Sequence, residues 1–311
     1  MVIDHDRLFK ELIQTFFREF MELFFPQASA GIDFDQLTFL SEELFTDVVA
    51  GERRRVDLLA QTKQRDENVL IIVHVEPQSY YQKDFAERMF IYSTRLYEKY
   101  RRRILPIGVF NYDGIRDEPD TFGWGFPFLE VMQYRFYTLE LRKCDWRHFV
   151  RQNNPVAAAL LSKMGYTEDE KVQVKLEFLR MLVRMELDPA RMHLIAGFFH
   201  KYFTLNEREE MKLREEIRML DRQEESLLAK LRTHWEVDAE SRGKIEGKTE
   251  EARKFIGKFL QAQFGERGAA LQAKIEGLQE LECLERLADQ LFKVSHIEEA
   301  QRLVDEARQD V

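Results

Sequence analysis

The segment VLIIVHVEPQ at residues 69–78 constrains the fold of this chain more than any other stretch. Apart from His74, its residues before Glu76 are apolar on both faces of an extended chain, which is typical of a central strand covered on both sides. A helix is predicted over 82–103, and a second apolar strand, ILPIGVFN, over 104–111. Because a helical crossover joins neighbouring parallel strands, these segments predict an α/β core.

The remaining segments divide the chain into a mixed first half and a helical second half. We expect a helix over 5–25, a strand over 54–64 with a hairpin turn after it, and a weaker strand over 134–141, while 32–50 is ambiguous. Helices are predicted over 155–164, 168–186, 189–203 and 206–234, then a polar linker over 235–250 and further short helices. We therefore expect domains at 1–150, 151–240 and 241–311.

Composition limits the compartment and the partners. The two cysteines, Cys144 and Cys283, form neither a disulfide framework nor a zinc-binding spacing, which favours a reducing cytoplasm. The start of the chain is acidic, and no apolar stretch approaches the roughly 18 residues of a membrane span, so no membrane partner is expected. The net charge of −9 does not favour nucleic acid, although the clusters at 53–55 and 101–103 leave room for a local basic groove.

Two carboxylates and an amide gather at the ends of the neighbouring strands. Period-two geometry puts Glu76 and Gln78 on one face, and Asp57 on the adjacent strand can face the same side. Asp57 and Glu76 could then share one Mg²⁺, with Mn²⁺ as an alternative and the backbone carbonyl of Pro77 as a further ligand. Such a metal activates water against a phosphodiester, and Gln78 could orient that water. The pattern suggests a nuclease.

Each candidate residue also fits a structural role. Asp57 could form an ordinary ion pair with a neighbouring arginine, and Glu76 could simply end a strand at solvent. For Glu11 we expect a solvated helix position, with a metal-site carboxylate as the alternative. For His74 we expect a hydrogen-bonded core histidine rather than a metal ligand.

The arrangement D…E-x-Q resembles the variant catalytic motif of recombination-promoting, transposase-like nucleases within the PD-(D/E)XK nuclease superfamily. The stretches that carry this resemblance are DHDRLFKELI, RRRVDLLAQTK, VLIIVHVEPQS and FAERMFIYSTRLYEKY, within residues 4–115. The resemblance implies a restriction-endonuclease-like α/β core with a mixed central sheet flanked by helices, Mg²⁺-dependent DNA cleavage, and a site of Asp57, Glu76 and Gln78. The wider superfamily usually has a lysine at the position of Gln78. The missing positive charge could come from Lys63 or Lys83, and Lys83 and Arg88 could contact phosphate.

The last 65 residues or so resemble a small helical domain of unknown function that often follows such cores, in an all-α C-terminal region. We therefore expect a cytoplasmic, Mg²⁺-dependent DNA endonuclease that acts in DNA recombination and forms a homo-oligomer through its helical C-terminal half. RNA is not excluded as the substrate. The alternative is a catalytically silent nuclease-fold protein that serves as an interaction or oligomerisation module.

Overall fold

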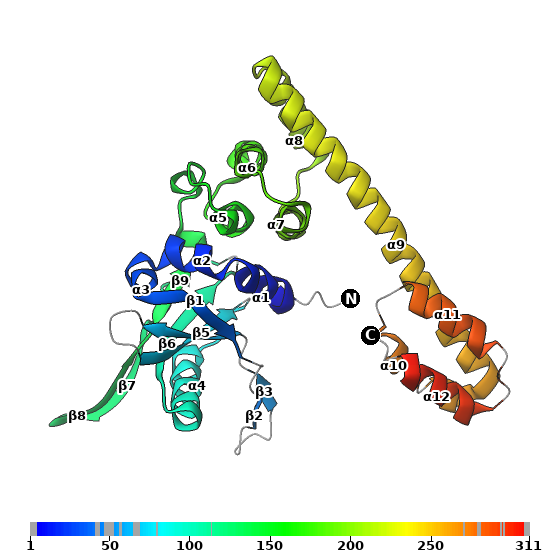
Figure 1. Cartoon of the computed structure of the whole chain (residues 1–311), viewed down its shortest axis with the longest axis horizontal. Coiled ribbons are helices and arrows are strands. Elements are labelled where there is room, and N and C mark those ends of the chain that lie inside the picture. Colours follow the sequence, from blue (N-terminus) through cyan, green and yellow to red (C-terminus); the bar gives the residue numbers. More distant parts are fainter. Residues whose placement is uncertain are drawn as a thin grey trace. The chain divides into compact units, whose positions relative to one another are not determined.

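The computed structural model describes residues 5–40, 44–46, 53–55, 58–64, 69–78, 80–112, 114–269, 271–278, 281–292, 294 and 296–307. The chain divides into two compact units, Met1–Leu228 and Ala229–Val311 (Figure 1). The first unit is a mixed α/β structure with a helical layer, and the second is helical. The predicted α/β class with an all-α C-terminal region is therefore confirmed. The domain boundaries expected near residues 150 and 240 stay predictions.

The core of the first unit is a five-stranded sheet in the order β1-β4-β5-β6-β9. Its strands are β1 (Ile32–Phe39), β4 (Leu58–Gln64), β5 (Val69–Gln78), β6 (Arg103–Phe110) and β9 (Tyr137–Glu140). β4 pairs antiparallel with β1 and β5, whereas β6 pairs parallel with β5 and β9. The expected parallel crossover from β5 through a helix to β6 is confirmed. β5, which carries the apolar run, is therefore the central strand. It pairs antiparallel with β4 on one side and parallel with β6 on the other.

Helices cover both faces of this sheet. Figure 1 shows α4 (Phe85–Tyr100) on one face and α1 (His5–Thr15) and α2 (Phe17–Phe24) on the other, followed by α3 (Pro26–Ala30). The helix expected over 5–25 is interrupted at Phe16, whose φ of −121° and ψ of 43° are not helical. Its phenylalanine stripe is nevertheless buried as expected, with Phe9, Phe16 and Phe20 at 1% exposure or less.

Two hairpins stand outside the five-stranded sheet. β2 (Leu44–Thr46) pairs antiparallel with β3 (Arg53–Arg55), and β7 (Thr121–Phe126) pairs antiparallel with β8 (Leu129–Arg135). A single strand was expected over 54–64. In the structure its described residues belong to two strands, β3 and β4, which lie in different sheets. The strand expected over 134–141 likewise spans the end of β8 and all of β9, because the chain changes partners at Phe136.

The helical layer of the first unit contains α5 (Pro155–Leu160), α6 (Lys171–Met185), α7 (Pro189–Tyr202) and α8 (Glu207–Arg218). The short 3₁₀ helices η1 (Leu141–Lys143), η2 (Trp146–His148), η3 (Leu161–Lys163) and η4 (Glu168–Glu170) complete it. The helices predicted from 155 to 203 are confirmed. This layer packs on the first helices, since the rings of Phe9 and Phe198 lie 5.6 Å apart and Asn154 Nδ2 donates to the carbonyl of Glu19 at 2.9 Å.

The helix predicted over 206–234 ends early, and the linker predicted over 235–250 is helical. α8 ends at Arg218, and α9 (Arg222–Ala269) runs through the whole of the expected linker. The linker segment has no proline, and an isolated glycine costs a helix only about 1 kcal/mol, so Gly243 and Gly247 do not end it. Gly265 does depart from helical geometry, at φ 58° and ψ −139°.

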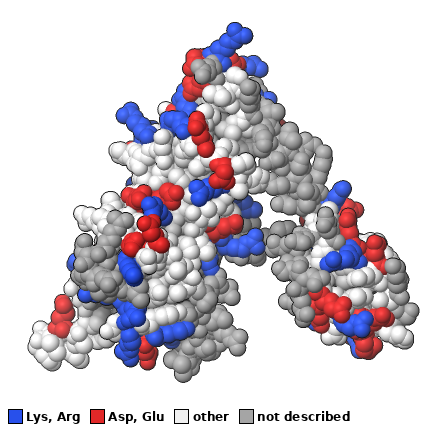
Figure 2. Space-filling model, in the orientation of Figure 1, with Lys and Arg blue, Asp and Glu red and all other residues white. Residues whose placement is uncertain are grey.

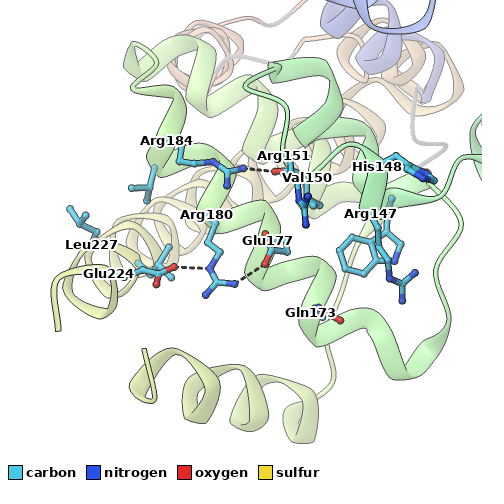
Figure 3. A pocket seen from close by; sticks show the side chains of 13 residues that line it. Arg147, His148, Val150, Arg151, Gln173, Glu177, Arg180, Arg184, Glu224 and Leu227 are labelled. Atoms are coloured by element: carbon cyan, nitrogen blue, oxygen red, sulfur yellow. Dashed lines mark hydrogen bonds and ion pairs between the residues drawn. The ribbon is translucent and has the colours of Figure 1, made fainter. Parts of the chain in front are cut away.

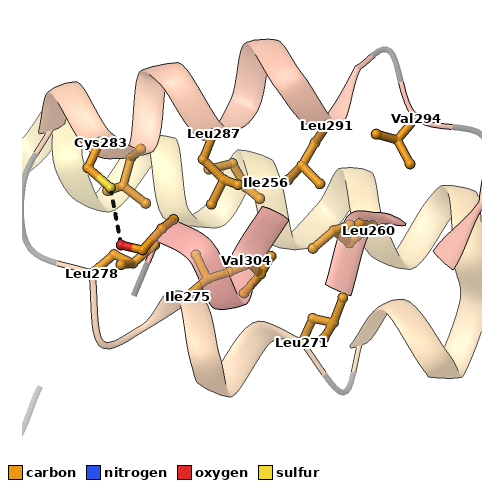
Figure 4. Close-up of a cluster of buried hydrophobic side chains, with 13 residues drawn as sticks. Ile256, Leu260, Leu271, Ile275, Leu278, Cys283, Leu287, Leu291, Val294 and Val304 are labelled. Carbon is orange, nitrogen blue, oxygen red and sulfur yellow. Dashed lines mark hydrogen bonds between the residues drawn. The ribbon is translucent and has the colours of Figure 1, made fainter. Parts of the chain in front are cut away.

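The second unit has its own apolar core between α9, α10 (Gln272–Ile275), α11 (Leu281–Leu291) and α12 (Ile297–Ala307) (Figure 4). Leu260, Leu284 and Val304 are fully buried in it. Cys283 also lies in this core, where its Sγ donates to the carbonyl of Ala307 at 3.7 Å. Within the described part of the chain, no helix combines the length and the apolar character that crossing a membrane requires.

Candidate active site

Glu76 and Gln78 lie near the carboxyl end of β5, on the sheet face that α4 covers. Side chains alternate between the faces of a strand, so His74, Glu76 and Gln78 project from the same face. Ile72, the preceding residue of this series, packs against Leu96 of α4 and so identifies the face. All three polar side chains are buried, with exposures of 0%, 4% and 4%. A polar row therefore runs under α4 where sequence alternation predicts it.

His74 and Glu76 form a buried hydrogen bond. The Nε2 atom of His74 lies 3.2 Å from Oε2 of Glu76, and the edge of the imidazole ring meets Tyr92 of α4 at 5.9 Å between centroids. An ionised carboxylate only accepts, so Nε2 is the donor of this bond when Glu76 is ionised. Nδ1 has no hydrogen-bond partner among the described residues. The expectation of a hydrogen-bonded core histidine is confirmed.

Arg88 brings a positive charge from α4 to this row. Its Nη2 atom donates a hydrogen bond to Oε1 of Gln78 and lies 3.8 Å from Oε1 of Glu76. The guanidinium also lies over the ring of Phe85, 5.2 Å from its centroid, and the side chain is only 11% exposed. Arg88 thus holds the neutral Gln78 and the anionic Glu76 together.

The burial of Glu76 excludes the simplest alternative for it. A strand end that had reached solvent would leave the carboxylate hydrated, whereas Glu76 is 4% exposed. A buried carboxylate is costly unless it is hydrogen bonded and paired. His74 and Arg88 supply those interactions, so Glu76 is part of a built polar cluster inside the unit.

The residues predicted on β4 are only partly described. Asp57 lies outside the described residues. Lys63 pairs across the sheet with Leu70, six residues from Glu76, which is roughly 20 Å at about 3.3 Å per residue. The structure therefore does not bring Lys63 to Glu76.

The remaining predicted residues take separate positions. Lys83 is exposed in the turn that precedes α4, and Glu11 is exposed on α1, as a solvated helix position requires. Pro77 lies between Glu76 and Gln78, is buried, and pairs with Val109 of β6. Of the supporting residues expected from the sequence, the structure brings Arg88 into contact with Glu76 and Gln78.

The described side chains fit a divalent metal only in part. They supply one carboxylate, Glu76, and one amide oxygen, Gln78, both of the hard oxygen type that Mg²⁺ takes. No group of three or more His, Cys, Asp and Glu side chains within the described ranges could hold a metal. A magnesium site here needs Asp57 as its second carboxylate and needs Arg88 to release Oε1 of Gln78.

On the face drawn in Figure 2, Lys and Arg side chains are interspersed with Asp and Glu. The chain as a whole carries a net charge of −9. On this face, positive charge is therefore not gathered into one broad patch.

Comparisons with known proteins add no relative. No protein-family model, no curated protein and no solved structure matches this chain. The resemblance of its motifs to the recombination-promoting nucleases therefore stays a prediction.

Proposed function

We propose that the chain is a Mg²⁺-dependent DNA endonuclease of the recombination-promoting, transposase-like class. The observation that carries the proposal is the buried carboxylate of Glu76 at the end of a central strand, beside Gln78 and Arg88. The described register of β4 and β5 ends with Leu58 opposite Val75, one residue short of Asp57 and Glu76. The proposal requires that register to continue by one pair, so that the two carboxylates can share a metal.

Each residue then has a distinct role. Asp57 and Glu76 would hold the metal, together with the carbonyl of Pro77. Bound Mg²⁺ supplies the polarisation of the phosphodiester and the acidified water that hydrolysis needs. Once Arg88 releases its Oε1 atom, Gln78 would accept a hydrogen bond from the attacking water and orient it. Arg88 supplies, from the helix, the positive charge that a lysine at the position of Gln78 would bring, and neither Lys63 nor Lys83 is needed.

Plasmid nicking tests this assignment. We expect cleavage that requires Mg²⁺ or Mn²⁺ and that falls at least a hundredfold in Asp57→Ala and in Glu76→Gln. Glu87→Gln is the matched control, because Glu87 is an exposed carboxylate in the first turn of α4. Equal cleavage by wild type and Asp57→Ala would remove the proposal. Labelled RNA in a parallel reaction decides between the two nucleic acids.

The role of Arg88 has a separate test. If the guanidinium stabilises charge that develops during hydrolysis, Arg88→Gln should lower kcat by one to three orders of magnitude with little change in KM. Arg88→Lys keeps the charge and should recover part of kcat. An unchanged kcat in Arg88→Gln would show that the charge comes from elsewhere.

A catalytically silent interaction module is the second candidate. The specific observation in its favour is that His74 and Arg88 already occupy the two carboxylate oxygens of Glu76. Calorimetry with Mg²⁺ and Mn²⁺ separates the candidates, because a silent module binds neither ion. Light scattering tests the homo-oligomer that we propose for the helical C-terminal half in either case, and a monomer would overturn it.

A further inference from the structure

A cavity of about 970 Å³ lies in the helical layer of the first unit (Figure 3). It is bounded by residues 146–151, by one side of α6 and by the beginning of α9, all within Met1–Leu228. Gln173, Glu177, Arg180 and Arg184 are spaced four, three and four residues apart, so they form one stripe along α6 that faces the cavity. Its volume lies in the range of about 300–1,000 Å³ that small-molecule sites occupy.

The charges that line the cavity do not cancel. Four arginines and two glutamates take part, but both glutamates bind the same arginine. Arg180 donates to Glu224 at 2.6 Å and to Glu177 at 2.7 Å. These two carboxylates are therefore committed to Arg180 and do not neutralise Arg151 or Arg184.

Two of those arginines meet no carboxylate. Arg184 donates to the backbone carbonyl of Val150, which is neutral. Within the described ranges, neither Arg184 nor Arg151 has a carboxylate at ion-pair distance, while Arg147 is paired with Asp145 and Glu170. Arg151 and Arg184 thus leave two uncompensated guanidinium groups at one cavity.

An unsatisfied donor accompanies them. Trp146 also lines the cavity and is 1% exposed, and its indole Nε1 has no hydrogen-bond partner among the described residues. This nitrogen is itself buried, so a ligand in the open part of the cavity does not reach it. The two guanidinium groups at this cavity favour an anion with several oxygens.

The cavity also has an apolar side. Val150, Val183 and Leu227 contribute to its lining, and Leu227 is 43% exposed. A free inorganic anion would leave this apolar surface uncovered, whereas a ligand with a planar organic part would bury it. We propose that the cavity binds a nucleoside phosphate, with the phosphate on Arg151 and Arg184 and the base against the apolar side. This site is separate from Glu76 and does not depend on the nuclease proposal.

Calorimetric titration of the full chain with AMP, ADP and inorganic phosphate tests the proposal. EDTA is present throughout, and the Glu76→Gln variant is titrated in parallel, so that metal-dependent binding at β5 does not contribute. We expect AMP or ADP to bind at least tenfold more tightly than inorganic phosphate. Arg151→Gln and Arg184→Gln should each weaken nucleotide binding about tenfold. Both side chains are exposed, so neither change should alter the melting temperature without ligand.

Arg214→Gln is the matched control, because Arg214 is an exposed arginine on α8 that does not line the cavity. It should leave the affinity unchanged. No saturable binding up to millimolar nucleotide would overturn the proposal, and so would equal affinities for AMP and inorganic phosphate. Binding that survives both Arg151→Gln and Arg184→Gln would place the nucleotide elsewhere.

Discussion

Glu76 and Lys175 show two different ways in which this chain accommodates a buried charge. Glu76 is 4% exposed, forms a hydrogen bond with His74 and lies beside the guanidinium of Arg88. Lys175 is 8% exposed on α6, with its Nζ over the rings of Phe199 at 5.1 Å and Phe178 at 5.7 Å. The first charge is stabilised by polar partners, whereas burial disfavours the second although its Nζ lies over two aromatic rings. Each of the two buried charges leads to a prediction about stability.

Removal of Arg88 should destabilise the protein through Glu76. Arg88→Met leaves a buried carboxylate without its cation, which typically costs about 3–5 kcal/mol in the free energy of unfolding. Glu76→Gln in the same chain should restore much of that loss, so urea unfolding of the double-mutant cycle should give a coupling above about 1 kcal/mol. Arg102→Met, at an exposed position, serves as the control. Additive effects of the two changes would contradict the interaction.

Lys175 should make stability depend on pH at alkaline values. Burial lowers the pKa of Lys175 to about 8, while the charge of Glu210 acts in the opposite direction. Between pH 8 and the ordinary lysine value, the unfolded chain binds more protons than the folded chain, so the free energy of unfolding rises with pH. Lys175→Met removes the buried charge and should stabilise the protein at pH 7 by roughly 1–3 kcal/mol.

Chemical denaturation at several pH values from 7 to 10.5 checks the Lys175 prediction. In Lys175→Met the stability should rise less across this window than in the wild type. Lys212→Met, an exposed lysine on α8, should keep the wild-type slope. An identical slope in Lys175→Met would mean that Lys175 titrates as it does in the unfolded chain.

At the scale of elements, Asn154 connects the helical layer to the sheet domain. Its Oδ1 caps α5 by accepting from Val156 N at 2.9 Å and from Ala157 N at 3.0 Å, and its Nδ2 reaches the carbonyl of Glu19 in α2. Asn154→Ala should cost about 1–2 kcal/mol for the cap and more for the lost link. Thermal unfolding measures this loss. Asn153→Ala, one residue earlier and exposed, should have an effect within about 0.5 kcal/mol.

The β5-α4-β6 unit was predictable from the sequence, because its two apolar strands and the helix between them follow one another along the chain. A helical crossover then implies that the two strands pair in parallel. The β7-β8 hairpin was not predicted, although Phe122, Trp124 and Phe126 alternate along β7, and its strands are largely exposed. Its glycines have a steric reason that only the pairing reveals: a Cβ on Gly123 would lie 2.5 Å from the carbonyl oxygen of Met132. The linker prediction at 235–250 was wrong because isolated glycines and polar residues weaken a helix without ending it.

The candidate site was predictable to a similar degree. Alternation along β5 puts Glu76 and Gln78 on one face, and the structure agrees. The contact of Arg88 with both depends on where α4 lies on the sheet, which no local pattern specifies. The stripe of α6 that lines the cavity is visible as a helical spacing, but its facing segment at 146–151 comes from a different part of the chain.

At the scale of the whole molecule, the two compact units have separate apolar cores. The core of Ala229–Val311 draws on α9 to α12, and the helical layer of Met1–Leu228 has its own buried residues on α6 and α7. Because the described members of the second core all lie within Ala229–Val311, each unit should unfold as its own cooperative transition. Differential scanning calorimetry of the full chain should therefore resolve two transitions.

Matched core truncations assign the two transitions. Leu284 on α11 and Leu182 on α6 are both fully buried leucines on helices. Leu→Ala at such positions costs about 2–5 kcal/mol, so Leu284→Ala should lower the melting temperature of one transition and Leu182→Ala that of the other. A single transition that both variants shift equally would mean that the units unfold as one. If the assignment holds, Leu284→Ala can be used to unfold the second unit selectively, and nucleotide binding at the cavity should survive at that temperature because every lining residue lies within Met1–Leu228.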